Sequence, residues 1–128
     1  MIEAGAVIGS NGQVIFWHAP QDRSGGALPD SRQLWDVLWD NRAELQGFAH
    51  SHPGGGVPGP SYTDVTTFAA VEAALGRRLA WWIVSVDHTS VVQWQGPDKL
   101  TYCGAVVEPE PHWVGRLREL SEIARYGE

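Results

Sequence analysis

The stretch GFAHSHPGGGVPGPSYTD, residues 47–64, decides our interpretation of the fold, because a strand, a loop and the start of a helix follow one another in it. QGFAHSH is predicted to form a short strand, and PGGGVPGP is rich in residues that favour turns. Ser61 is predicted to begin a helix that ends at Gly76. The apolar stripe of this helix would contain Val65, Phe68, Ala69 and Leu75.

On the N-terminal side of this stretch, the pattern predicts a hairpin and a helix. Residues 4–9 and 13–17 are apolar runs separated by an Asn-Gly pair, which is typical of a tight β-hairpin. A helix is then expected from an N-cap at Asp30 to about Glu44. Its apolar residues recur at helical spacing: Leu34, Trp35, Leu38 and Trp39.

On the C-terminal side, residues 78–86 and 89–96 predict two strands, and residues 101–108 a further one. Residues 113–127 predict a closing helix with one apolar face, made by Trp113, Leu117, Leu120 and Ala124. Strands mixed with helices in this order predict an α/β (α+β) sandwich built on a mixed sheet flanked by helices. Residues 1–128 are expected to form a single domain, because the length suits one core.

Composition excludes several function classes. The net charge is -6 and no basic cluster occurs, which argues against a nucleic-acid surface or an anionic membrane and fits a partner with a basic tail. A single cysteine, Cys103, rules out an internal disulfide; we expect it to be a buried or half-buried hydrophobe. No apolar run approaches the roughly 20 residues that span a bilayer, so we expect a soluble, cytoplasmic protein.

His50 and His52 have the spacing of metal ligands. Residues i and i+2 of a strand point to the same face about 6.6 Å apart, close enough for two imidazoles to bind one ion. Asp64 would lie in the first turn of the following helix, and two imidazoles with one carboxylate are typical of a catalytic zinc site. A simpler interpretation stays open for Ser61 and Asp64, since a serine and an aspartate at these positions also cap a helix.

Together these residues resemble the metal-binding signature of the JAB1/MPN/Mov34 (JAMM) metalloprotease family. The signature is an upstream glutamate, His-Ser-His-Pro, a short loop and Ser-x-x-Asp; here these are Glu3, residues 50–53 and residues 61–64. The loop is one residue longer than usual. The order of the strands and helices along nearly the whole chain is also similar. The resemblance implies a cytidine-deaminase-like sandwich and the prokaryotic type of JAB domain.

The resemblance also implies roles for residues. His50, His52 and Asp64 would bind one Zn²⁺ per chain, Glu3 would act as the general base, and Ser61 would stabilise the oxyanion. Glu44 is the nearest alternative among the upstream acids, but it is expected as a solvated charge at a helix end.

Members of this family cleave bonds after the C-terminal tail of ubiquitin-like or sulfur-carrier proteins. The tail would add as an extended strand to a sheet edge, and E1-like or E2-like proteins of the same pathway would be partners. Two alternatives remain open: a non-catalytic MPN-type scaffold, and a peptidase that trims the precursor of a sulfur carrier. The sequence indicates neither the oligomeric state nor the substrate-binding residues.

The remaining aromatic residues are interpreted as structural. Trp81 and Trp82 should point to opposite faces of one strand, one of them into the core. Core packing is expected for the tryptophans on the helical stripes, Trp35, Trp39 and Trp113. The three histidines without ligand spacing are expected in loops or on the surface: His18, His88 and His112.

Overall fold

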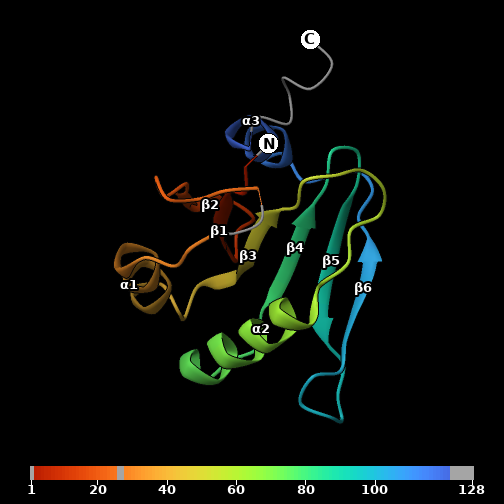
Figure 1. Ribbon diagram of the computed structural model, residues 1–128. Helices are drawn as coiled ribbons and strands as arrows, with labels where there is room; N and C mark the ends of the chain where they lie inside the picture. Colours follow the sequence, from red (N-terminus) through yellow and green to blue (C-terminus); the bar gives the residue numbers. More distant parts are fainter. Residues whose placement is uncertain (1, 26–27, 122–128) are drawn as a thin grey trace.

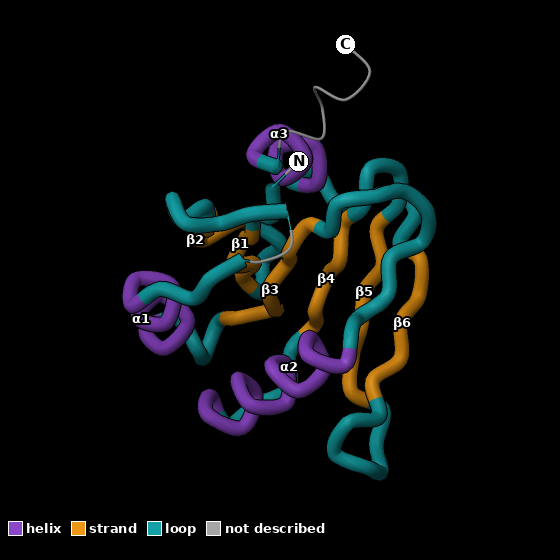
Figure 2. The backbone as a smooth tube through the Cα atoms, in the orientation of Figure 1, coloured by secondary structure: helices purple, strands orange, loops and turns teal. Residues whose placement is uncertain are grey.

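A computed structural model describes residues 2–25 and 28–121, which form six strands and three helices (Figure 1). In chain order the strands are β1 (Gly5–Gly9), β2 (Val14–His18), β3 (Leu45–Ser51), β4 (Ala80–Val84), β5 (Thr89–Trp94) and β6 (Tyr102–Val106). The helices are α1 (Arg32–Asp40), α2 (Tyr62–Leu75) and α3 (Val114–Leu120). The predicted mixed sheet flanked by helices is therefore confirmed, as Figure 2 also shows.

The strands form one sheet in the order β2-β1-β3-β4-β5-β6. All neighbours are antiparallel except β3 and β4, which run parallel and are joined through α2. The Asn-Gly hairpin between β1 and β2 is confirmed: Gly12 has φ 81°, a conformation that favours glycine. The parallel register pairs Ser51 at the carboxyl end of β3 with Val84 of β4, so His50 and the adjoining His52 lie at the carboxyl ends of these two strands.

Each face of the sheet carries its own hydrophobic core. The core on the α3 side contains Ala4, Ala6, Ile8, Ala49, Ala80, Trp82, Val84, Trp113, Val114 and Leu117. The core on the side of α1 and α2 contains Val7, Leu34, Leu38, Leu45, Phe68, Leu75, Leu79, Trp81, Ile83 and Val92. Trp81 and Trp82 thus lie on opposite faces, both buried, as their positions along β4 predict.

Helix α1 differs from its prediction at both ends and in its exposed face. It ends at Asp40 rather than near Glu44. The N-cap is Ser31 rather than Asp30, since the Ser31 hydroxyl accepts the N–H of Leu34 at 3.0 Å. Trp35 and Trp39 are 38% and 43% exposed and stack on each other, so the expected core packing of these two residues is wrong. Each tryptophan follows directly after a buried leucine of α1, Leu34 or Leu38, and so lies outside the stripe that α1 buries.

The C-terminal part of the chain has the predicted strands and helix, and it differs from the prediction in the burial of Cys103. Trp113 and Leu117 are buried as expected, and the segment of the predicted helix beyond residue 121, including Ala124, lies outside the described residues. Cys103 is exposed on the edge strand β6, which overturns the expectation of a buried thiol. None of the helices in the described part of the chain is long and apolar enough to cross a membrane.

Candidate metal centre

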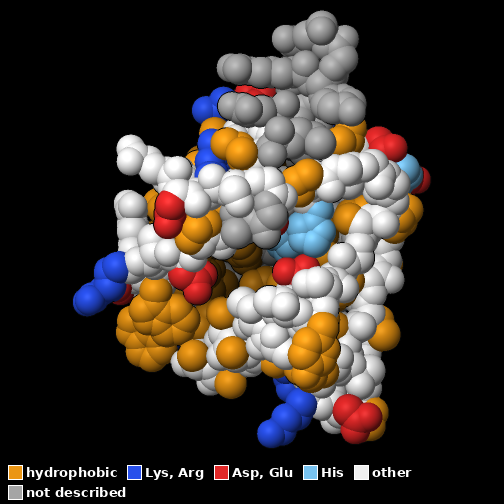
Figure 3. All heavy atoms as spheres, in the orientation of Figure 1, with side chains coloured by type: hydrophobic (Ala, Val, Ile, Leu, Met, Phe, Trp, Pro, Cys, Tyr) orange, Lys and Arg blue, Asp and Glu red, His pale blue; other side chains and the backbone are white. Residues whose placement is uncertain are grey.

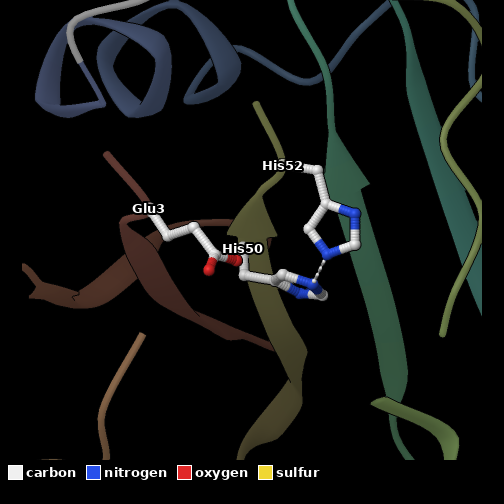
Figure 4. A group of neighbouring side chains, drawn as sticks. All are labelled: Glu3, His50 and His52. Carbon is white, nitrogen blue, oxygen red and sulfur yellow. Dashed lines mark hydrogen bonds between the residues drawn. The ribbon is translucent and has the colours of Figure 1, made fainter. Parts of the chain in front are cut away.

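The pairing of β1 with β3 brings Glu3 to the two histidines. Gly5 lies opposite His50 in the antiparallel register, and Glu3 stands two residues before Gly5. Alternation along a strand therefore places the Glu3 side chain on the same face as His50 and His52. Figure 4 shows the three side chains together, with His52 just beyond the end of β3.

The three side chains form a tight group. One carboxylate oxygen of Glu3 and one nitrogen of each imidazole all lie within 4.8 Å of one another. The Nε2 atoms of His50 and His52 are 2.8 Å apart, so one imidazole N–H donates to the other nitrogen. Glu3 is 8% exposed, so its carboxylate is largely shielded from bulk water.

Asp64 joins this group from the first turn of α2. Its Oδ2 lies 3.4 Å from Nε2 of His52 and 3.8 Å from Nε2 of His50. A capping box fixes the aspartate: Asp64 Oδ2 accepts the N–H of Ser61, and Ser61 Oγ accepts the N–H of Asp64, both at 3.0 Å. The capping interpretation of Ser61 and Asp64 is thus confirmed, and the same arrangement brings Asp64 close to both imidazoles; the roles of the two residues in the site stay predictions.

The loop between His52 and Ser61 is held against the turn between β4 and β5. Asp87 Oδ1 accepts the N–H of Gly56 at 2.8 Å, and the hydroxyl of Ser85 donates to the Gly56 carbonyl at 2.7 Å. Gly54 and Gly56 have φ of 112° and 86°, which glycine adopts without strain. These contacts fix a loop one residue longer than the usual signature, so that it still delivers Asp64 to the histidines.

Burial and hydrogen bonding shift the acids of the site in opposite directions. Burial raises the pKa of Glu3, although the two imidazoles act against this effect. Burial also acts to raise the pKa of Asp64, but hydrogen bonds from His50, His52 and the Ser61 N–H outweigh it and hold this pKa well below its usual range. The hydrogen bond with Asp64 raises the pKa of His52. Asp64 therefore remains a carboxylate, and Glu3 is the more basic of the two acids.

The donor set fits a zinc ion. Tetrahedral zinc with bonds of about 2.0–2.1 Å holds neighbouring ligand atoms about 3.4 Å apart. The two distances from Asp64 to the imidazoles, 3.4 and 3.8 Å, are close to this value, and the two imidazole nitrogens at 2.8 Å are nearer to each other. Two nitrogens and one oxygen are also the ligand types that zinc prefers. Glu3 lies near enough to act either as a further ligand or as a base.

A cavity of about 760 Å³ opens onto these residues. Glu3, His50, His52, Asp64 and Ser61 all line it. The remaining walls are mostly apolar and come from the segment before α1, from α1 and α2, and from the sheet: Leu28, Pro29, Leu34, Leu38, Phe48, Phe68, Val71 and Trp81. Figure 3 shows the hollow with a histidine at its rim and a hydrophobic patch over α1 beside it. The site thus combines titratable side chains with a cavity whose other walls are mostly apolar.

His18 is a cavity residue that the sequence pattern misplaced. It is 2% exposed, and its Nε2 lies 2.7 Å from the carbonyl oxygen of Pro29, so it is neither in a loop nor on the surface. His88 is half-buried and His112 is exposed, as expected for residues outside the core. Sequence carried no signal for His18, because its partner is a distant backbone carbonyl.

Ser51, between His50 and His52, was not assigned a role from the sequence. It is 1% exposed, and its Oγ accepts the N–H of Ala4, the residue after Glu3, at 2.9 Å. The available signal was a serine placed between two histidines at the end of a predicted strand.

Comparison with protein families gives one finding. A family model described as prokaryotic homologs of the JAB domain matches residues 3–96, which include every residue of the site. A search of curated proteins gave no match.

Proposed function

The chain belongs to the prokaryotic homologs of the JAB domain, and from this premise we propose that it is a zinc-dependent peptidase or isopeptidase. Its substrate is the bond that follows the C-terminal tail of a ubiquitin-like or sulfur-carrier protein. The observation that carries the proposal is the convergence of Glu3, His50 and His52, joined by Asp64, at one end of a cavity.

The zinc ligands in this proposal are His50, His52 and Asp64. A bound zinc ion supplies a Lewis acid that polarises the scissile carbonyl and lowers the pKa of water. Glu3 takes a proton from the attacking water and returns it to the leaving amine. Its burial favours this role, because the raised pKa makes the carboxylate a stronger base than an exposed one.

Ser61 is proposed to donate a hydrogen bond to the oxyanion. Its Oγ accepts the Asp64 N–H, which leaves the hydroxyl hydrogen available to the cavity that Ser61 lines. The same contact fixes the position of Oγ, so the donor oxygen is in place before a substrate arrives.

The partner in this proposal is a folded protein with an extended tail. The cavity volume of about 760 Å³ and its apolar walls suit the side chains of such a tail. The stacked Trp35 and Trp39 lie exposed on the helix that lines the cavity with Leu34 and Leu38, and they offer a surface for the folded body. Of the two edge strands, β2 borders the cavity through His18 and is the edge where the tail would add.

The test measures zinc and hydrolysis on the same samples. Elemental analysis of the wild-type protein and of His52→Ala, after exchange into chelator-free buffer, should give close to one zinc per chain in the first and none in the second. The wild-type protein should then cleave a ubiquitin-like or sulfur-carrier protein with a C-terminal extension, detected by mass spectrometry. Bound zinc without cleavage of any such substrate would favour a non-catalytic scaffold. Absence of zinc after adding it back would reject the proposal.

A further inference from the structure

Ser51 lies between His50 and His52 but faces the opposite side of the sheet. It is the last residue of β3, so its side chain points away from the cavity and toward the C-terminal end of α3. There the hydroxyl is fully enclosed, with 1% of the residue exposed. A buried hydroxyl in this position requires partners, and these partners lie in the segment that carries Glu3.

The Ser51 hydroxyl and N–H both bind the backbone of Ala4. Ser51 Oγ accepts the N–H of Ala4 at 2.9 Å, and the Ser51 N–H donates to the Ala4 carbonyl at 3.0 Å. The same Oγ is hydrogen-bonded to the hydroxyl of Ser121, the C-cap residue of α3, which is also buried. The Ala4 N–H belongs to the peptide unit that links Glu3 to Ala4. Ser51 therefore holds the peptide directly after Glu3.

The end of α3 fixes the same segment from behind. The Ser121 carbonyl accepts the N–H of Ile2 at 3.1 Å. One guanidinium nitrogen of Arg23 donates to the carbonyls of Leu120 at 2.9 Å and of Glu3 at 3.4 Å. The backbone on both sides of Glu3 is therefore hydrogen-bonded to Ser51, to Arg23 and to the end of α3. Of these partners, Ser51 belongs to β3, the strand that carries the proposed ligand His50.

We propose that Ser51 is a positioning residue for Glu3: its hydroxyl locks the peptide after Glu3 so that the carboxylate stays near the two imidazoles. This inference rests on the proposed function, in which Glu3 is the general base. Ser51 touches neither the cavity nor the reacting atoms. It couples the position of the base to the strand that holds the ligands, and a shift of about 1 Å in a reacting group can lower turnover by about 100-fold.

Ser51→Ala tests the proposal, and Ser51→Thr is its rescue. The alanine variant should retain zinc and the wild-type KM, and its kcat should fall by about 10- to 100-fold. The threonine variant keeps the hydroxyl and should recover most of the loss. Ser90→Ala is the matched control, because Ser90 is a 2% exposed serine of β5, separated from β3 by β4, and its hydroxyl has no hydrogen-bond partner among the described residues. It should leave kcat unchanged.

Amide hydrogen exchange supplies a readout that needs no substrate. In Ser51→Ala the Ala4 amide should exchange at least about 10-fold faster than in the wild type and in Ser90→Ala, because its acceptor is lost. A double variant with Glu3→Gln should be no slower in turnover than Glu3→Gln alone, since Ser51 acts only through Glu3.

Full turnover of Ser51→Ala, an unchanged Ala4 exchange rate, or a further loss in the double variant would each overturn the proposal. If Ser51→Ala fails to fold, Ser121→Ala replaces it, because this change removes only the hydroxyl behind Ser51. It should accelerate Ala4 exchange in the same direction, and unchanged exchange would count against the proposal. A wild-type protein that cleaves no substrate would reject the proposed function, and the exchange rates would still decide whether Ser51 fixes the backbone at Glu3.

Discussion

Replacing Glu3 by glutamine separates the two roles that the geometry permits for this residue. Glutamine has nearly the same shape as glutamate but is a far weaker base and a poor zinc ligand. The surrounding backbone should keep its position, because the N–H of Glu3 donates to the Ser24 carbonyl at 2.9 Å and the next residue is held by Ser51. The change therefore alters the chemistry of one group and leaves its placement intact.

The magnitude follows from the role. A general base contributes about 10²- to 10⁴-fold to turnover, which corresponds to about 2.7–5.4 kcal/mol of the activation barrier. No other acid of the site should replace it, because the pKa of Asp64 is held low and its Oδ2 faces both imidazoles. We expect Glu3→Gln to lose turnover by this factor while three ligands keep zinc bound at one per chain.

The assay compares kcat and zinc content in three proteins: the wild type, Glu3→Gln and Glu44→Gln. Glu44 is a matched control because it is an exposed acid in the turn before β3. It should match the wild type in both measurements. Loss of zinc from Glu3→Gln would make Glu3 a ligand, and turnover within about 10-fold of the wild type would remove it from the mechanism.

Three further changes test the remaining roles. Asp64→Ala should release zinc, because it removes one of three converging donors; one zinc per chain in this variant, by elemental analysis, would exclude Asp64 from the ligand set. Ser61→Ala should lower kcat by up to about 10²- to 10³-fold with zinc retained, and a fall in Tm alone would leave capping as its only role. Burial, reinforced by the hydrogen bond to Glu72, raises the pKa of Tyr102 to about 12 from its ordinary value of 10.0. The folded protein thus keeps a phenol proton that the unfolded chain loses, so the contribution to stability is full below pH 10 and is lost as the pH rises toward 12. Chemical denaturation across this range should show a weaker pH dependence for Tyr102→Phe, and identical curves for the two proteins would refute the assignment.

The family and much of the fold could be predicted because their signals are local. The hairpin at Gly12 and the helix between Ser61 and Gly76 are encoded by residues that specify a turn, an N-cap and a C-cap within a few positions. The family predicted from the motif is confirmed by the match to residues 3–96. Where a segment's own residues decide its conformation, sequence reasoning was sufficient.

Burial was predicted less well, because it depends on what lies opposite. Leu34 and Leu38 are buried, and Trp35 and Trp39, one position further round the same helix, are exposed. A short helix that packs on one side buries only the stripe that faces its partner. The width of this contact cannot be predicted from the residues of the helix alone. Cys103 was misplaced for the same reason, since β6 is an edge strand and the described elements leave its side exposed.

The site shows the same division between local and distant information. The spacing of His50 and His52 is encoded within three residues, and the alternation of side chains along a strand alone predicts that both point to the same face of the sheet. The position of Glu3 depends on the register of β1 against β3, in which Gly5 lies opposite His50, and a slip of one residue would turn Glu3 to the other face. The contact of Ser51, the last residue of β3, with Ala4, directly before β1, continues this pairing and holds the two strands in that register. Ser51 therefore connects the two histidines, whose spacing the sequence encodes locally, to Glu3, whose position depends on the fold. For this reason we expect replacement of Ser51 to change the position of the proposed base Glu3 and to leave zinc binding intact.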